Sequence, residues 1–220
     1  MLRRLAAEFI GTAMLLTAVV GSGIMAERLA GGNIAVALLA NTIATGAALF
    51  VLVVMFSKVS GAHFNPVVTL IDLIDGAMGL KQAGLYTVAQ ITGALVGTAV
   101  ANLMFELPIF FASGKVRTGG AQWLGEFVAT FGLVGVIIAC SRRHNSIAIV
   151  AAAVAAYIIA AYWFTSSTSF ANPAVTIARS LSDTFVGIRP VDAPAFIGAQ
   201  VLGGVGAILL FRWLIPKEDV

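Results

Sequence analysis

The sequence predicts an all-α membrane protein with six transmembrane helices and two re-entrant half-helices, arranged as two inverted repeats of three spans each. Three observations predict this fold class. Of the 220 residues, 60% are hydrophobic and 10% are charged, which is typical of a chain that lies in lipid. Six apolar stretches are long enough to cross a bilayer. The string Asn-Pro followed by a small apolar residue occurs twice, in near-equivalent positions of the two halves.

Each predicted span is a largely apolar run of the length that crosses the hydrocarbon core as a helix, roughly 20 residues. The runs cover about residues 5–27, 33–57, 81–105, 120–141, 147–165 and 192–214. The first run follows Arg3 and Arg4 as a signal peptide would, but Glu8 interrupts it and it is longer than a signal core. We therefore expect the first span to be retained, within a single transmembrane domain over residues 1–220.

Two short segments begin with an Asn-Pro pair, one after the second span and one after the fifth. In chain order the motifs are Asn65, Pro66 and Val67, and Asn172, Pro173 and Ala174. Asn is a preferred N-cap, and Pro is tolerated in the first helical turn, where its missing N–H has no helical partner. Each pair therefore predicts the start of a helix too short to span the membrane. Half-helices of this kind line cavities.

An internal repeat relates the two halves, about residues 1–112 and 113–220. Residues 7–12 and 125–130 share a small-Glu-Phe-branched-small-Thr pattern, which makes Glu8 and Glu126 equivalent. Small residues at four-residue spacing follow in the third and sixth spans: Ala89, Gly93 and Gly97, then Ala199, Gly203 and Ala207. They predict close helix crossings within the protomer or, alternatively, a contact between protomers. Because three spans is an odd number, the second copy is inverted in the membrane.

The inversion points the two half-helices at each other from opposite faces. Their N-termini would then meet near the midplane, each with free N–H groups and about half a positive charge. Cations are repelled there, whereas the Asn65 and Asn172 side chains can offer N–H donors to a passing oxygen. This arrangement favours a neutral, hydroxylated solute.

Basic residues indicate the orientation of the six spans. On the side of both termini lie Arg3, Arg4, Lys58, Lys81, Arg142, Arg143, Arg212 and Lys217, against Arg28, Lys115, Arg117, Arg179 and Arg189 on the other. The positive-inside rule therefore predicts cytoplasmic termini, in a plasma or inner membrane. The net charge of +3 comes largely from these anchors, and no basic aromatic patch predicts nucleic-acid binding.

A known family shares these motifs. The matching residues are 61–69, 171–176, Glu8, Glu126, Gln90 and Gln200. In them the chain resembles the aquaporins, also called major intrinsic proteins, over essentially its whole length. The resemblance implies a passive pore in each protomer of a homotetramer in the lipid bilayer, with no enzymatic activity, cofactor or metal. It also implies that Glu8 and Glu126 hold the loops beside the half-helices, and that His63 supports the first loop, although His63 could instead be a pH sensor at the cytoplasmic mouth.

In this family four positions build a narrow selectivity filter. Counting from the two Asn residues places them at Thr45, Ala160, Ser169 and Val175. Most members carry Arg three residues after the second Asn, where this chain has Val175. None of the four is aromatic or charged, so we expect a wide, uncharged mouth. One gap in the loop before Asn172 would put Phe170 or Thr168 in place of Ser169.

Arg179 is seven residues after Asn172, and Asp72 is seven after Asn65. Two helical turns are about 10 Å along the axis. We therefore expect both side chains to anchor half-helix ends at the membrane interface, with Arg179 outside the constriction.

A filter without Arg and aromatics resembles that of bacterial aquaporin-like channels associated with arsenic resistance. The implied solutes are small and neutral: arsenite, antimonite and polyols such as glycerol. One alternative is a general water and glycerol channel. Another is an ion-coupled secondary transporter, whose titratable candidates would be Glu8, Glu126 and His63. Cys140 is the lone cysteine, so the chain forms no internal disulfide.

Overall fold

The computed structural model describes residues 1–144 and 146–216, and these form eight helices and no strand. Six of the helices are long and apolar enough to cross a membrane. They are α1 (Leu2–Leu29), α2 (Ile34–Ser60), α4 (Leu80–Met104), α5 (Gly120–Arg143), α6 (Ile147–Phe164) and α8 (Ala193–Leu214). The six predicted spans are confirmed, with ends close to those expected from the apolar runs. Lys217, counted among the basic anchors, lies outside the described residues.

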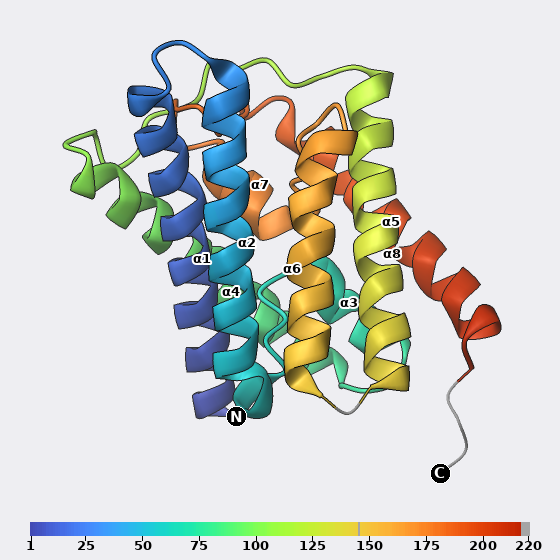
Figure 1. Cartoon of the computed structure of the whole chain (residues 1–220). Coiled ribbons are helices and arrows are strands. Elements are labelled where there is room, and N and C mark those ends of the chain that lie inside the picture. The colour runs from blue at the N-terminus through green and yellow to red at the C-terminus, as the bar shows by residue number, and fades with distance from the viewer. Residues whose placement is uncertain (145, 217–220) are drawn as a thin grey trace.

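The two remaining helices are the predicted half-helices, α3 (Pro66–Ile74) and α7 (Pro173–Arg179). Figure 1 shows them between the long helices, α3 in the lower half of the bundle and α7 in the upper half. Each begins as the motif predicts. The side-chain oxygen of Asn65 accepts a hydrogen bond from the Val67 N–H at 2.9 Å, and that of Asn172 accepts one from the Ala174 N–H at 3.0 Å.

The long helices pack closely in equivalent pairs, α1 against α4 and α5 against α8. A Cβ atom added to Gly93 would lie 2.3 Å from the carbonyl oxygen of Phe9, and one added to Gly203 would lie 2.4 Å from that of Phe127. Only glycine allows two backbones to approach this closely. The small-residue pattern is thus explained by helix crossings inside the chain. The two crossings occupy equivalent positions in the two repeats, as Glu8 and Glu126 do.

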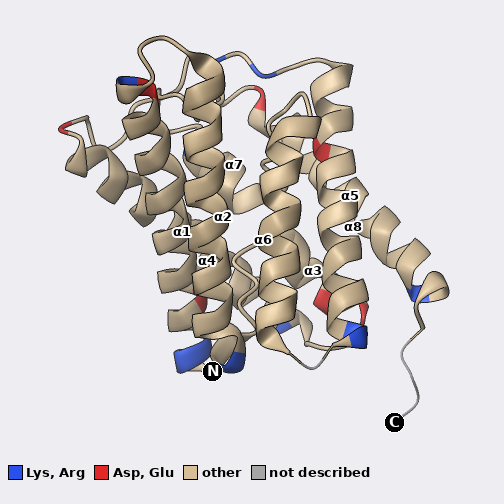
Figure 2. Cartoon of the chain, viewed as in Figure 1, with Lys and Arg blue, Asp and Glu red and all other residues tan. Residues whose placement is uncertain are grey.

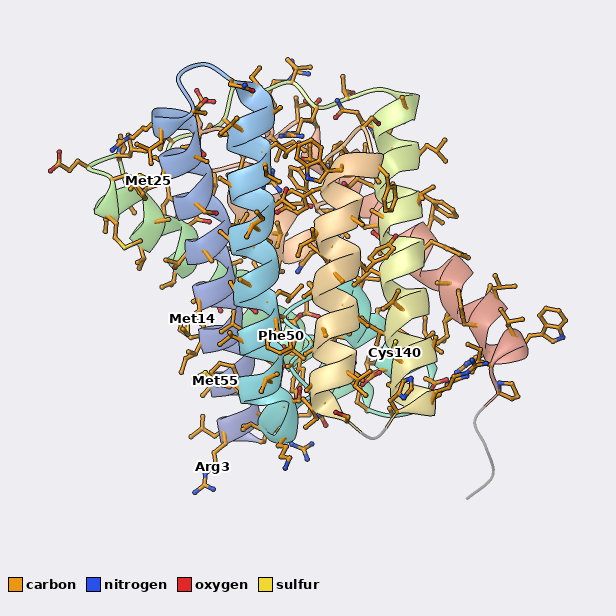
Figure 3. All side chains as sticks on the ribbon, in the orientation of Figure 1. Arg3, Met14, Met25, Phe50, Met55 and Cys140 are labelled. Carbon is orange, nitrogen blue, oxygen red and sulfur yellow. The ribbon has the colours of Figure 1, made fainter. Side chains whose placement is uncertain are left out.

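The bundle presents apolar side chains outward and basic side chains towards its two ends. Figure 3 shows Met14, Met25 and Met55 pointing away from the helices, and all three are exposed. Figure 2 shows Lys and Arg at the end where α1 begins and also at the opposite end, where α1 finishes and the segment between α4 and α5 runs. At the first of these ends Arg212 on α8 donates a hydrogen bond to Asp75 at 2.9 Å, so this end is also tied across the repeats. An apolar belt with a basic rim is the surface that a bilayer requires.

Candidate pore and its lining

A fully buried glutamate, Glu8, holds the loop that leads into α3. It accepts four hydrogen bonds, from the backbone N–H groups of His63 (3.1 Å) and Phe64 (2.8 Å), from Ser60 Oγ (2.6 Å) and from Gln90 Nε2 (2.8 Å). The loop needs this support because Ala62 and Phe64 have φ angles of 53° and 49°, a left-handed backbone that is costly for residues other than glycine. The carboxylate offsets that cost by satisfying the N–H groups that the conformation turns towards it.

The second loop repeats this arrangement around Glu126. This carboxylate accepts from the N–H groups of Phe170 (2.8 Å) and Ala171 (2.9 Å) and from Gln200 Nε2 (2.6 Å). Ser169 and Ala171 have φ angles of 48° and 49° and, like the strained pair in the first loop, stand three residues and one residue before the capping Asn. The contacts agree with the loop-supporting roles expected from the resemblance, and both repeats use the same solution.

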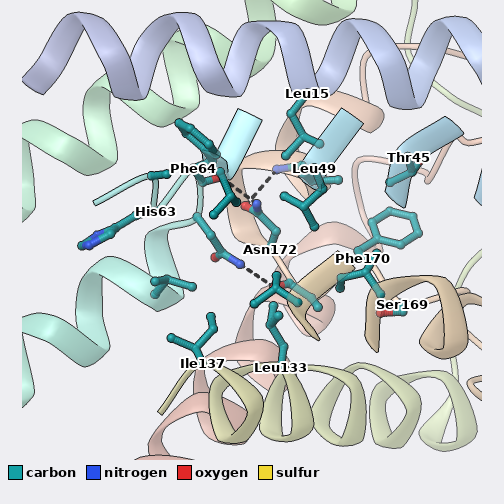
Figure 4. A pocket seen from close by; sticks show the side chains of 18 of the residues that line it. Leu15, Thr45, Leu49, His63, Phe64, Leu133, Ile137, Ser169, Phe170 and Asn172 are labelled. Carbon is teal, nitrogen blue, oxygen red and sulfur yellow. Dashed lines mark hydrogen bonds between the residues drawn. The ribbon is translucent and has the colours of Figure 1, made fainter. Parts of the chain in front are cut away.

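The two capping asparagines bind the opposite loop. Asn65 Nδ2 donates to the carbonyl oxygen of Ala171 at 2.7 Å, and Asn172 Nδ2 donates to that of Phe64 at 2.8 Å. Figure 4 draws both bonds as dashed lines across the centre of the cavity. An amide nitrogen carries two N–H groups. Each asparagine therefore keeps one donor for an oxygen in the cavity while the other joins the half-helices.

A single cavity of about 300 Å³ passes both asparagines. At about 30 Å³ per water in the liquid, this volume corresponds to a file of roughly ten waters. Apolar side chains from the long helices form much of the wall, among them Leu15, Leu49, Leu133, Ile137, Val154 and Ile158. Figure 4 shows His63 at one end of the cavity and Thr45 and Ser169 at the other. The cavity is thus an apolar tube with hydrogen-bonding groups at its centre and near its ends.

Three of the four predicted filter residues line this cavity, namely Thr45, Ser169 and Val175. The placement of Ala160 in the filter is wrong, because this residue is exposed on the outer side of α6. Ile158 and Tyr162 line the cavity from that helix instead. Successive helical residues are rotated by about 100°, so a two-residue error in counting back across the loop moves a side chain to the opposite face.

The expectation of a mouth without aromatic or charged residues is also wrong. Tyr162, Phe170 and Arg179 all line the cavity. Arg179 is only 2% exposed, and its Cζ lies 3.3 Å from the centre of the Phe170 ring. It was expected further out because its Cα is two turns beyond Asn172, but helical side chains tilt towards the helix N-terminus. That tilt carries the long arginine side chain back into the cavity.

Asp72 was also expected to anchor a helix end, and the structure places it in the cavity lining beside His63. The Nε2 atom of His63 lies 3.1 Å from Asp72 Oδ2, and its Nδ1 atom lies 3.0 Å from Thr69 Oγ1. Both ring nitrogens therefore have partners. His63 belongs to the Glu8-supported loop through its backbone N–H, and its ring lies at one end of the cavity.

Arg117 is a buried residue to which the sequence analysis gave no role at the mouth. Its Nε donates to the carbonyl oxygen of Gly187 at 2.7 Å, its Nη1 donates to that of Ser167 at 3.0 Å, and its guanidinium lies over Phe170. It belongs to the segment between α4 and α5, and burial lowers the pKa of this guanidinium to about 10. Because its partners lie in two distant segments, no local pattern in the sequence could reveal it.

No group of three His, Cys, Asp or Glu side chains in the described ranges is arranged to hold a metal ion. Cys140 is half-buried on α5 with a free thiol. The candidate site is therefore the cavity itself, with its lining and the two loops that support it.

Comparisons with known proteins agree with this geometry. The sequence profile of the family described as "Major intrinsic protein" matches residues 1–161. The "Aquaglyceroporin AqpS" of Rhizobium meliloti is 55% identical over 213 residues, covering 97% of this chain and 90% of the relative. "Aquaporin A" of Dictyostelium discoideum is 33% identical over 96% of this chain and 78% of the relative. In fold, the chain is similar to the X-ray structure of the aquaglyceroporin from Plasmodium falciparum, with a TM-score of 0.76, 20% identity and coverage of 98% and 97%.

Proposed function

Because the chain belongs to the major intrinsic protein family, whose members are passive channels and not enzymes, we propose that it conducts small uncharged hydroxylated solutes. Glycerol and other short polyols belong to this class, and so do arsenite and antimonite in their neutral trihydroxy forms. The bacterial relative is named an aquaglyceroporin, which supports glycerol. The metalloids are included because their uncharged trihydroxy forms present hydroxyl oxygens much as glycerol does.

Val175 is the observation that carries the proposal. It lines the cavity three residues after Asn172, where most members of the family have arginine, and it is only 6% exposed. Thr45 and Ser169 also line the cavity and are small and neutral. Replacing a long charged side chain by valine widens the path, which suits a solute larger than water.

The distribution of polar groups supports the same class of solute. Apolar side chains of α1, α2, α5 and α6 line much of the cavity, while the spare amide donors of Asn65 and Asn172 lie at its centre. A polyol has both a carbon skeleton that tolerates an apolar wall and hydroxyl oxygens that accept hydrogen bonds. A small ion would lose its hydration shell along such a wall without replacement.

The test is permeability in vesicles that contain the purified protein, measured for water, glycerol and arsenite. The Val175→Arg variant should lower glycerol and arsenite flux by about tenfold or more while sparing water, because it narrows and charges the path. Val175→Met is the matched control, since it adds length without charge. Fast water with no glycerol or arsenite flux in the unmodified protein would refute the wide-filter proposal and leave an ordinary water channel.

The general water and glycerol channel remains a second candidate, supported by the names of the relatives. Arsenite flux separates it from the metalloid proposal, because only the latter requires passage of the trihydroxy metalloid. The flux of an ion-coupled transporter would saturate with solute concentration and would depend on pH. A channel gives flux that is linear in solute gradient and independent of pH.

We also propose that the chain assembles as a homotetramer in the plasma or inner membrane, with both termini in the cytoplasm and one pore in each protomer. The basic rim at the end where α1 begins supports the orientation. Labelling of single cysteines from the two sides of intact cells, in a Cys140→Ser background, tests the topology. The mass of the detergent-solubilised protein tests the assembly.

A further inference from the structure

Arg179 is the buried charge that the proposed function does not use. Among the described residues it takes part in none of the ion pairs. Its Nε donates to the carbonyl oxygen of Val186, and one flat face of the guanidinium lies on the Phe170 ring. An arginine has five N–H donors, of which four belong to the two terminal nitrogens. No described residue accepts a hydrogen bond from those four.

The free donors can only face the cavity. Arg179 is almost fully buried, one face is covered by Phe170, and the Nε edge is held by Val186. The residue also belongs to the cavity lining. Buried guanidinium groups in proteins are nearly always hydrogen-bonded. The acceptors that this cavity offers are the oxygens of whatever passes through it.

The inverted repeat independently marks this position as pore-lining. Arg179 and Asp72 both stand seven residues after their capping Asn, and both line the cavity. Their partners are equivalent too, because Phe170 and His63 each stand two residues before that Asn. The Asp72–His63 pair and the Arg179–Phe170 pair are thus the same contact in the two halves, one at each end of the path.

We propose that Arg179 is the selectivity arginine of this pore, offering paired N–H donors to the hydroxyl oxygens of a solute and excluding cations from the outer mouth. This inference rests on the proposed channel function. Two neighbouring hydroxyl oxygens match the paired N–H groups of a guanidinium edge. With the charge supplied by Arg179, the residue at position 175 can be small. Arg179 then selects against charge, while Val175 sets the width of the pore.

The strength of the cation barrier follows from Coulomb's law. With an effective dielectric constant of about 20, a cation about 5 Å from the guanidinium is disfavoured roughly 300-fold. The positive ends of the half-helices add to the barrier but do not depend on Arg179. Removing the arginine should therefore change the passage of cations strongly and that of neutral solutes little.

Urea and the guanidinium ion make a sharp probe pair, because they have nearly the same size and planar shape but differ in charge. The experiment measures both fluxes, together with glycerol flux, in vesicles that contain the full chain. The unmodified protein should pass urea and largely exclude guanidinium. In Arg179→Met, which keeps a long side chain over Phe170, the ratio of urea flux to guanidinium flux should fall roughly 300-fold. Arg189→Met is the matched control. Arg189 is a basic residue on the same side of the predicted membrane as Arg179, but it does not line the cavity.

Two further variants keep the inference testable if Arg179→Met does not fold. Arg179→Lys should retain exclusion of guanidinium because it retains the charge. The double variant Val175→Arg with Arg179→Met should restore the ratio and reduce glycerol flux. Free passage of guanidinium through the unmodified protein overturns the inference without any variant, as does an unchanged ratio in folded Arg179→Met. If neither glycerol nor urea passes the unmodified protein, the proposed function itself fails.

Discussion

Replacing Glu126 by Gln tests whether one carboxylate holds the strained loop before α7. The carboxylate accepts the Phe170 and Ala171 N–H groups on different oxygens and Gln200 Nε2 on the second of them. An amide has only one oxygen, so at least one backbone N–H becomes a buried unsatisfied donor, at a cost of about 1–3 kcal/mol. The hydrogen bonds that remain lose the assistance of a charge, which costs roughly a further 1 kcal/mol each.

The expected loss of stability is therefore about 2–5 kcal/mol, or a fall of roughly 5–15 °C in the midpoint of thermal unfolding. The assay is thermal unfolding of the purified protein in detergent, followed by intrinsic fluorescence. Glu27→Gln is the control, because Glu27 is an exposed carboxylate near the end of α1. A midpoint for Glu126→Gln equal to that of the control would refute the argument that the carboxylate stabilises the loop.

Two other expectations follow from the packing and the outer loop. Gly97→Ala should strongly lower the midpoint of thermal unfolding, because its Cβ would lie 2.1 Å from a backbone carbonyl oxygen of α1. Gly84→Ala on the same helix is the control, since its Cβ would meet nothing within 4 Å and the change should be neutral or stabilising. Equal effects of the two substitutions would contradict the close crossing of α1 and α4. Burial, together with the nearby charges of Arg117 and Arg179, lowers the pKa of the Lys115 amine to about 8. The neutral, reactive form of this amine therefore increases as the pH rises through that value, and the rate of its acetylation should be half-maximal near pH 8. Mass spectrometry compares the native protein with the denatured one, where an ordinary lysine titrates at about 10.4; identical profiles would contradict the expected environment.

The fold was predictable because each of its elements has a local cause. Apolar length alone defines the six spans, and the Asn-Pro pairs at Asn65 and Asn172 define where the half-helices begin. Glu8 and Glu126 could be identified because a carboxylate inside an apolar span needs donors, and the strained loops supply them. In each case the residue and its reason lie within one segment or one repeat.

The lining of the cavity near α7 was less predictable, because it depends on the rotation of each helix about its axis and on side-chain direction. Ala160 was misplaced by a count across a loop, which cannot fix the rotation of α6. The predicted position of Arg179 was wrong because it was based on the distance of the Cα atom from Asn172 along the helix, whereas the guanidinium lies closer to the helix N-terminus, over Phe170. The buried contacts of Arg117 could not be predicted, since its partners at Ser167 and Gly187 are brought to it only by the folded chain.

Comparison of the two repeats distinguishes the residues that support the loops from the residues that line the cavity. Positions that support the loops are chemically identical in both halves, as Gln90 and Gln200 show by binding their respective glutamates at 2.8 Å and 2.6 Å. Positions that meet the solute keep their geometry but change their chemistry, from Asp72 beside His63 to Arg179 over Phe170. An inverted repeat turns such a difference into a difference between the two ends of the path. A solute would therefore meet a carboxylate at one mouth and a guanidinium at the other, and exchanging these two residues should move the cation barrier to the opposite mouth without altering the loops that hold the asparagines.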